Sequence, residues 1–440
     1  MRAQWTLWAR CGLALILGVA VQTLAAQPEP VKGGAIPVEV VQDENGFHLL
    51  RGGEPYQVRG AGLEFGDMAA LAAHGGNSLR TWRTDNGQMT GLEVLDRAAA
   101  HGLTVMMCIE IGRERLGFDY DDEAAVADQL AAARREVVKY KDHPALLAWM
   151  IGNEVNLSYS NPRVFDAVND ISRMIHDVDG KHPTTTALAG FDAQVVKAVT
   201  ARAPDLDFLS IQMYGDIVNL EERIRASGYG GPYFVTEWGA VGHWEVGTTA
   251  WGAPVEQDSS QKAASYQRAW DLAITRNPDR MLGSYVFLWE QKQERTPTWY
   301  GMFLEDGSET EAIDVMHRIW TGMAPENRAP RIESMKLAGM TAFENVTLAP
   351  GNLAQARVFV SDPDGDALDY EWRIMRESEA KQEGGDRELV PETLEGRVMI
   401  KAPGHVEINA PSEPGPYRLF VYARDGRGSA AHANIPFLVR

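Results

Sequence analysis

Short apolar runs recur along the first three quarters of the chain, separated by stretches with helical periodicity. Most of these runs, such as LLAWMIG and YFVTEWG, are almost entirely apolar, which is typical of strands buried on both faces of a parallel sheet. They predict eight strands, at Gln57–Phe65, Asn77–Trp82, Thr104–Gly112, Leu146–Glu154, Pro183–Leu188, Phe208–Gly215, Tyr233–Gly239 and Gly283–Trp289.

The stretches between these runs predict helices. Residues Asp122–Tyr140 are acidic at the start, rich in Ala in the middle and basic near the end, in agreement with the helix dipole. Pro162–Val178 and Gln261–Thr275 carry apolar residues at helical spacing. Eight strands alternating with helices across residues 35–323 predict a (β/α)₈ TIM barrel. A doubly wound open sheet is the alternative, but neither G-x-G-x-x-G nor a P-loop follows any predicted strand.

The pattern changes after Ala324–Arg331, a polar segment that contains two prolines. Beyond it, polar and apolar residues alternate with period two, as in QARVFVSD and YRLFVYARD. This pattern predicts a small β-sandwich, within which the highly charged segment Arg376–Glu395 is expected to form a mobile loop. We therefore expect a signal peptide at residues 1–26, a barrel at 27–325 and an immunoglobulin-like sandwich at 326–440.

The N-terminal segment is expected to be removed from the mature protein. Arg2 and Arg10 precede an apolar run from Cys11 to Val21, and small residues stand before Gln27. This is the pattern of a secretory signal peptide, and the run is too short for a membrane span. A retained N-terminal anchor is the alternative. The sequence thus predicts a periplasmic or secreted protein with no stable membrane insertion after cleavage.

The composition narrows the range of partners and reactions. Among the 440 residues, 61 are acidic and 42 basic, giving a formal net charge of -19, which argues against a nucleic acid or an anionic membrane as partner. A polyanionic substrate would need a local basic pocket. Cleavage at the predicted site leaves Cys108 as the only cysteine, so no intramolecular disulfide is expected. The sequence contains neither H-E-x-x-H nor G-x-S-x-G, and we expect no metal and no cofactor in the active site.

Two glutamates close predicted strands on different sides of the barrel. Glu154 ends the fourth strand and Glu237 the seventh, and active sites of such barrels lie at the C-terminal ends of strands. A carboxylate directly after an apolar run is costly to bury without a function. Two of them can flank one glycosidic bond, as in retaining glycosidases, where they stand about 5–5.5 Å apart. Each glutamate alone has a structural alternative, namely pairing with an arginine or a helix N-terminus.

The segments HPALLAWMIGNEVN (143–156) and YFVTEWGA (233–240) resemble glycoside hydrolase clan A, in particular the barrels of family 2 and the β-1,3-glucanosyltransferases. The resemblance covers most of residues 57–320. It implies that Glu154 is the general acid/base, that Glu237 is the nucleophile, and that Asn153 binds the 2-hydroxyl group of the sugar.

The same resemblance implies further substrate-site residues at strand ends. Arg80 is expected to hold the nucleophile ionised, Tyr214 to contact it, and Trp289 to form the floor of the sugar site. Their structural alternatives are a surface ion pair for Arg80 and core packing for the two aromatic residues.

The mouth of the predicted barrel is acidic and aromatic. Glu110 and Glu290 end strands, where they would either touch substrate or raise the pKa of Glu154 by charge repulsion. Trp244 and Trp299 lie in loops, where they either stack on sugar rings or pack the loops together. As sugar subsites they would favour a neutral oligo- or polysaccharide.

The C-terminal part resembles bacterial immunoglobulin-like or cadherin-like modules through its DPDGD and ARDGRG turns. The acidic turn Asp362–Asp366 is a candidate for weak Ca²⁺ binding through its oxygens. The alternative is a polar hairpin turn with Asp and Gly at their preferred positions.

These observations predict a retaining glycoside hydrolase or transglycosylase that acts on β-linked glucan or related β-glycans by double displacement. The alternative is a non-catalytic carbohydrate-binding or cell-envelope scaffold protein built on a glycosidase barrel. The sequence does not choose between exo and endo action or between hydrolysis and transfer, because these depend on the subsites.

Overall fold

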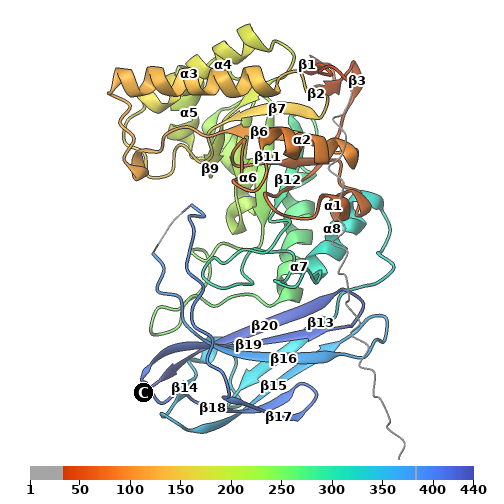
Figure 1. Cartoon of the computed structure of the whole chain (residues 1–440), viewed down its shortest axis with the longest axis vertical. Coiled ribbons are helices and arrows are strands. Elements are labelled where there is room, and N and C mark those ends of the chain that lie inside the picture. Colours follow the sequence, from red (N-terminus) through yellow and green to blue (C-terminus); the bar gives the residue numbers. More distant parts are fainter. Residues whose placement is uncertain (1–32, 382–383) are drawn as a thin grey trace, which may run out of the picture.

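A closed ring of parallel strands forms the upper half of the molecule, and two packed sheets form the lower half (Figure 1). The structure is a computed structural model that describes residues 33–381 and 384–440, so the predicted signal peptide lies outside the described residues. In the ring, the strand order is β8-β7-β6-β5-β4-β12-β11-β10-β9. The bounds are β4 Val58–Gly62, β5 Ser78–Arg80, β6 Thr104–Ile109, β7 Leu146–Ile151, β8 Thr184–Thr185, β9 Ala187–Ala189, β10 Leu209–Gln212, β11 Tyr233–Gly239 and β12 Met281–Phe287.

The ring confirms the predicted (β/α)₈ barrel. Strands β8 and β9 are separated by Thr186 alone and occupy the position of one predicted strand, and β12 pairs in parallel with β4. An open doubly wound sheet would leave that last pairing unmade. Each predicted strand is present. Five of them are three or four residues shorter than the predicted run, chiefly at the C-terminal end, where the chain turns into the loops.

Helices follow the strands and cover the outside of the barrel. They are α1 Met68–Ala73, α2 Gly91–Ala100, α3 Glu123–Tyr140, α4 Arg163–Val178, α5 Ala193–Arg202, α6 Leu220–Ser227, α7 Ser259–Ala269 and α8 Glu311–Thr321. Asp122, expected as the first residue of α3, is its N-cap and accepts hydrogen bonds from the amides of Ala124 and Ala125. Within the described residues, no helix is both long enough and apolar enough to cross a membrane.

A small N-terminal sheet closes the barrel at the end opposite the candidate site. Its strands are β1 Val38–Asp43, β2 Gly46–Arg51 and β3 Glu54–Pro55. The amides of Val38 and Phe47 donate to the carbonyls of Lys181 and Asp279, which lie in loops before β8 and β12. The sequence pattern did not predict this sheet.

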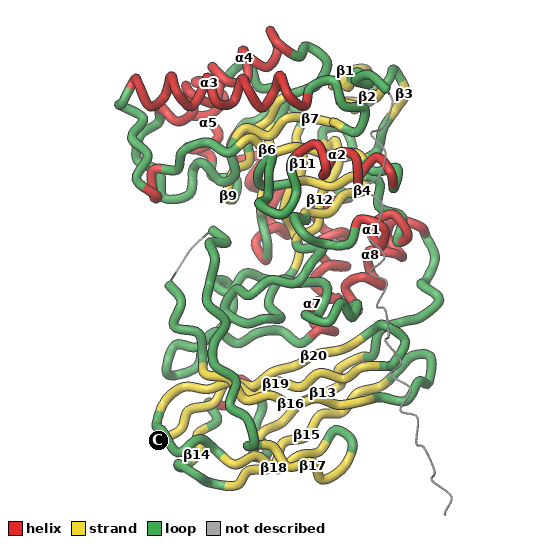
Figure 2. The backbone as a smooth tube through the Cα atoms, in the orientation of Figure 1, coloured by secondary structure: helices red, strands yellow, loops and turns green. Residues whose placement is uncertain are grey.

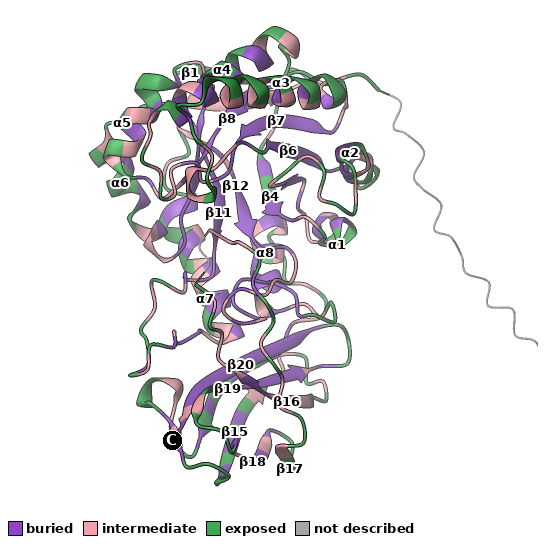
Figure 3. Ribbon diagram, turned by 60° about the vertical axis from the view of Figure 1, so that its left-hand side comes forward, coloured by how far each residue is buried: buried purple, intermediate pink, exposed green. Residues whose placement is uncertain are grey.

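The lower half is the predicted β-sandwich. One sheet has the order β13 (Arg331–Leu337), β15 (Leu353–Ser361), β18 (His405–Asn409), β17 (Val398–Ala402), and the other β14 (Thr347–Leu348), β20 (Ala430–Val439), β19 (Gly415–Arg424), β16 (Asp369–Arg376). Strand β15 alternates buried and exposed residues along most of its length, as predicted. Strands β19 and β20 are instead buried nearly throughout, because one face packs in the sandwich and the other against the barrel (Figure 3).

A buried polar network joins the two halves. The Glu256 carboxylate accepts hydrogen bonds from Lys262 at 2.5 Å and from Asn434 of β20 at 2.6 Å. Arg418 of β19 donates to the carbonyl of Pro254 at 2.8 Å. The predicted boundary at residue 326 falls in the connection between α8 and β13.

Candidate active site

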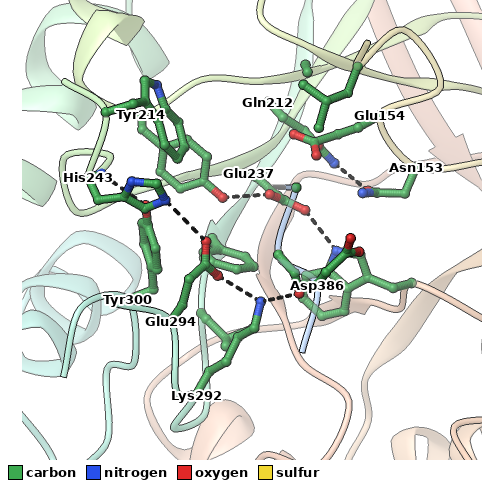
Figure 4. Close-up of a pocket in the computed structure, with 18 of the residues that line it drawn as sticks. Asn153, Glu154, Gln212, Tyr214, Glu237, His243, Lys292, Glu294, Tyr300 and Asp386 are labelled. Atoms are coloured by element: carbon green, nitrogen blue, oxygen red, sulfur yellow. Dashed lines mark hydrogen bonds and ion pairs between the residues drawn. The ribbon is translucent and has the colours of Figure 1, made fainter. Parts of the chain in front are cut away.

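The C-terminal ends of the barrel strands surround a pocket of about 740 Å³ (Figure 4). Six of the residues predicted from the sequence line it, namely Asn153, Glu154, Tyr214, Glu237, Trp244 and Glu290. The volume is in the range of pockets that enclose one small ligand, about 300–1,000 Å³.

Glu237 lies at the centre of a set of hydrogen-bond donors. Its Oε1 accepts from Arg80 Nη1 and from Trp82 Nε1, each at 2.9 Å. Its Oε2 accepts from the hydroxyl of Tyr214 at 2.6 Å. The side chain is 5% exposed, and one of its three donors is a cation. These contacts fix both carboxylate oxygens in the pocket.

Arg80 connects this carboxylate to a second strand end. The arginine is fully buried in β5, and its Nη2 donates to Asn153 Oδ1 at 2.8 Å. Gln212 Nε2, at the end of β10, donates to the same oxygen at 2.7 Å. Both donors therefore engage the amide oxygen of Asn153, which assigns its Nδ2 group as the donor for a ligand in the pocket. The structure places Arg80 against the predicted nucleophile rather than in a surface ion pair.

Glu154 stands beyond the end of β7 in an unusual backbone conformation. Its φ is +49°, a left-handed value that costs free energy for a residue with a side chain. Burial raises the pKa of Glu154 well above its usual range, and the negative charge of Glu237 raises it further. The pocket therefore contains one carboxyl group with a raised pKa, Glu154, beside a second one, Glu237, that binds a buried arginine.

Aromatic residues form the wall beside Glu237. The ring of Tyr214 lies 5.7 Å from that of Phe287, 5.6 Å from that of Tyr300 and 5.6 Å from that of Trp244. Burial raises the pKa of Tyr214 well above 10, so its hydroxyl remains a donor. Trp244 is 61% exposed at the pocket, which makes its ring accessible to a sugar.

Three residues expected at the substrate do not line the pocket. Trp289 is fully buried, and its indole nitrogen donates to the carbonyl of Asp67. Strand β12 ends at Phe287, and Phe287 faces the pocket in the place expected for Trp289, because the chain turns away after it. Trp299 is 1% exposed and donates to the carbonyl of Val241, so it packs loops together.

Glu110 is also outside the pocket. It follows Ile109, the last residue of β6, and its side chain is exposed although both faces of the strand before it are buried. Glu290 does line the pocket, where it accepts hydrogen bonds from the amides of Glu64 and Phe65. Burial raises the pKa of Glu290.

Several residues of the site were not predicted. Trp82 lies two positions after Arg80 in the segment NSLRTW, so the alternation of a strand places both on one face and was the available signal. Lys292 and Glu294 lie in the irregular loop after β12, where no periodic signal exists. Lys292 Nζ donates to Glu294 Oε2 and to the carbonyl of Gly385, both at 2.8 Å (Figure 4).

The acidic turn of the sandwich lies away from this pocket. Among the described residues, Asp362, Asp364 and Asp366 are the one group of three potential metal ligands within 4.8 Å of one another. Arg328 binds Asp364 at 2.6 Å and Arg427 binds Asp366 at 3.2 Å. These arginines balance much of the charge, which favours the polar turn; Ca²⁺ binding there stays a prediction.

Comparison with known proteins gives relatives in structure only. No protein-family model and no curated protein matches the chain. It is similar to β-glucuronidase 2 of Bacteroides uniformis, with a TM-score of 0.52, 12% identity, and coverage of 92% of this chain and 48% of that chain. For a β-glucuronidase of Bifidobacterium dentium, the TM-score is 0.51 and the identity 17%, with coverage of 66% of this chain and 50% of that chain. For a putative β-galactosidase of Bacteroides fragilis, the TM-score is 0.50 and the identity 15%, with coverage of 92% of this chain and 58% of that chain.

The chain thus spans about half the length of these solved structures. At such identities the likeness shows the fold, a TIM barrel with an attached sandwich, and agrees with the expected resemblance to clan A barrels.

Proposed function

We propose that this protein is a retaining β-glycosidase in which Glu237 is the nucleophile and Glu154 the general acid/base. The observation that carries the proposal is that one pocket contains two carboxyl groups in different surroundings, which suit them to opposite roles. Glu237 accepts three hydrogen bonds, one of them from the buried cation of Arg80, whereas burial and a neighbouring charge raise the pKa of Glu154. A sugar-binding scaffold has no use for such a pair.

In the first step, a carboxylate oxygen of Glu237 forms a bond to the anomeric carbon of the substrate. The bond from that carbon to the leaving oxygen breaks, and Glu154 transfers its proton to this oxygen. The Nδ2 group of Asn153 donates to a hydroxyl group of the bound sugar, an interaction that accelerates the reaction where it is stronger in the transition state.

In the second step, Glu154 acts as a base. It takes a proton from the acceptor hydroxyl, whose oxygen bonds to the anomeric carbon while the bond to Glu237 breaks. Two displacements at one carbon retain its configuration. The acceptor is water in a hydrolase and a sugar hydroxyl in a transglycosylase, and both outcomes use the same two residues.

For the substrate we propose β-linked glucan or a related β-glycan. The exposed ring of Trp244 at the pocket offers a surface for the apolar face of a sugar. The structural neighbours are named as β-glucuronidases and a putative β-galactosidase. An assay on β-glycosides of glucose, galactose, mannose and glucuronic acid therefore determines which sugar the enzyme accepts.

The test compares the wild type with Glu237→Ala and Glu154→Ala on aryl β-glycosides of these sugars. We expect turnover by the wild type and its loss in Glu237→Ala. Glu154→Ala should lose about 10²–10⁴-fold on substrates with poor leaving groups, and less on activated ones that need no proton. Tight sugar binding by all three proteins without turnover would support the scaffold alternative.

Two further measurements assign the mechanism. A 2-fluoro glycoside of the active sugar should label Glu237, as found by peptide mass analysis, and the first product should have the β configuration by NMR. Product analysis at high acceptor concentration separates hydrolysis from transfer. A label on another residue would overturn the assignment of Glu237.

We also propose that the reaction takes place in the periplasm or outside the cell. The support is the charged and apolar pattern that includes Arg2, Arg10 and the run from Cys11 to Val21. N-terminal sequencing of the exported protein should begin at Gln27; an uncleaved chain held in the membrane would indicate a retained anchor instead.

A further inference from the structure

The pocket of the barrel has one wall that comes from the sandwich. The loop between β16 and β17 rises from the sandwich to the barrel mouth (Figures 1 and 2). Gly384, Gly385, Asp386 and Arg387 of this loop line the same pocket as Glu154 and Glu237. The segment expected to be a mobile loop therefore forms part of the candidate site.

A partly buried ion pair connects the loop to the barrel. Asp386 accepts hydrogen bonds from both terminal nitrogens of Arg115, at 2.5 and 3.0 Å, and lies 3.8 Å from Arg113. The Arg115 side chain is 13% exposed. Such a two-pronged contact sets the orientation of the loop as well as its distance from the barrel.

Two further contacts between the loop and the barrel lie on either side of Asp386. The carbonyl of Gly385 accepts from Lys292, whose ammonium group also lies 5.9 Å from the Phe287 ring of the pocket. The carboxylate of Glu388, 1% exposed, accepts from the amide of Arg295 at 2.7 Å.

The backbone of the loop approaches the barrel closely, at positions where glycine is required. Gly384 and Gly385 have φ values of +61° and +73°. A Cβ on Gly384 would lie 2.7 Å from the side chain of Leu157, and one on Gly385 would lie 2.8 Å from Lys292 Nζ. Leu157 is three residues beyond Glu154, so the loop touches the segment that carries the proposed acid/base.

We infer that the sandwich is a component of the active site, and that its loop crosses the mouth of the pocket so that the site accepts the end of a glycan chain. The contacted residues follow β6 and β7, which are neighbours in the ring, and β12, which lies four strands from β7 and therefore on the opposite side of the barrel mouth. A chain cut at an internal bond would have to continue through the space that Gly384–Asp386 occupy. This inference rests on the proposed glycosidase activity.

The first test follows the products formed by the wild type from an oligosaccharide labelled at its reducing end. The sugar is the one whose aryl β-glycoside the enzyme cleaves. We expect stepwise shortening from the unlabelled end. Early cuts at internal bonds by an enzyme active on the aryl glycoside would overturn this inference alone, whereas absence of turnover on any aryl glycoside would refute the proposed function.

The second test removes the ion pair between Asp386 and Arg115, with the variants Asp386→Ala and Arg115→Ala and the double variant. We expect each to raise KM for the oligosaccharide about tenfold, and the double variant to add little, because both remove the same contact. The matched control is Asp306→Ala, which removes an ion pair of 2.6 Å to Arg424 between the same two halves but outside the pocket. It should leave KM unchanged. Loop variants that keep the wild-type KM while folded would contradict the inference.

Discussion

The hydroxyl group of Tyr214 provides a direct test of how the site holds its proposed nucleophile. This group donates to Glu237 Oε2 at 2.6 Å, and Tyr214 is 8% exposed. The variant Tyr214→Phe removes only this donor and keeps the ring that packs against Phe287 and Tyr300. Arg80 and Trp82 both bind the other oxygen, so Oε2 would lose the donor that the tyrosine supplies.

The expected size of the effect follows from the charge of the acceptor. A hydrogen bond to a charged group contributes about 1.5–3 kcal/mol, and each step of about 1.4 kcal/mol is a tenfold change in rate. Tyr214→Phe removes the donor that holds Oε2 of the proposed nucleophile in place. We therefore expect kcat/KM to fall by about 10–100-fold.

The assay is the steady-state kcat/KM on an aryl β-glycoside for the wild type and the variant. Tyr229→Phe is the matched control, because its hydroxyl donates at 2.8 Å to the carbonyl of Pro232, away from the pocket. It should keep the wild-type kcat/KM. A folded Tyr214→Phe protein with the wild-type kcat/KM would refute this account of Glu237.

Four other outcomes are expected. Burial and the charge of Glu237 raise the pKa of Glu154 to about 8, so kcat/KM should fall as the pH rises through about 8 and Glu154 loses its proton. A fall in kcat/KM that begins near pH 5 would contradict this prediction. Lys262→Met should lower the free energy of unfolding by about 3–5 kcal/mol in denaturant titrations, since it leaves the buried carboxylate of Glu256 unpaired. Trp244→Ala should raise KM severalfold with kcat and stability retained, as measured by steady-state kinetics and thermal unfolding. Trp289→Ala should instead destabilise the fold by about 3–5 kcal/mol, because its ring is fully buried in the core.

Much of the architecture was determined by the sequence itself. Apolar runs of strand length, with helical periodicity between them, predict a barrel because both signals are local in the chain. In such a barrel the ends of strands converge, so Glu154 and Glu237 could be assigned to one mouth although 83 positions separate them by their numbers. The alternation in the last quarter of the chain predicted the sandwich for the same reason.

The tertiary structure alone decided which side chains turn into the pocket and what closes it. Strand β12 ends at Phe287, two residues before the predicted end, and Trp289 lies in the core. The contact of Arg115 with Asp386 joins positions 271 residues apart, and that of Lys292 with Gly385 joins positions 93 residues apart. Periodicity carries no information about such pairs, because they form only when the barrel and the sandwich pack together through the buried faces of β19 and β20.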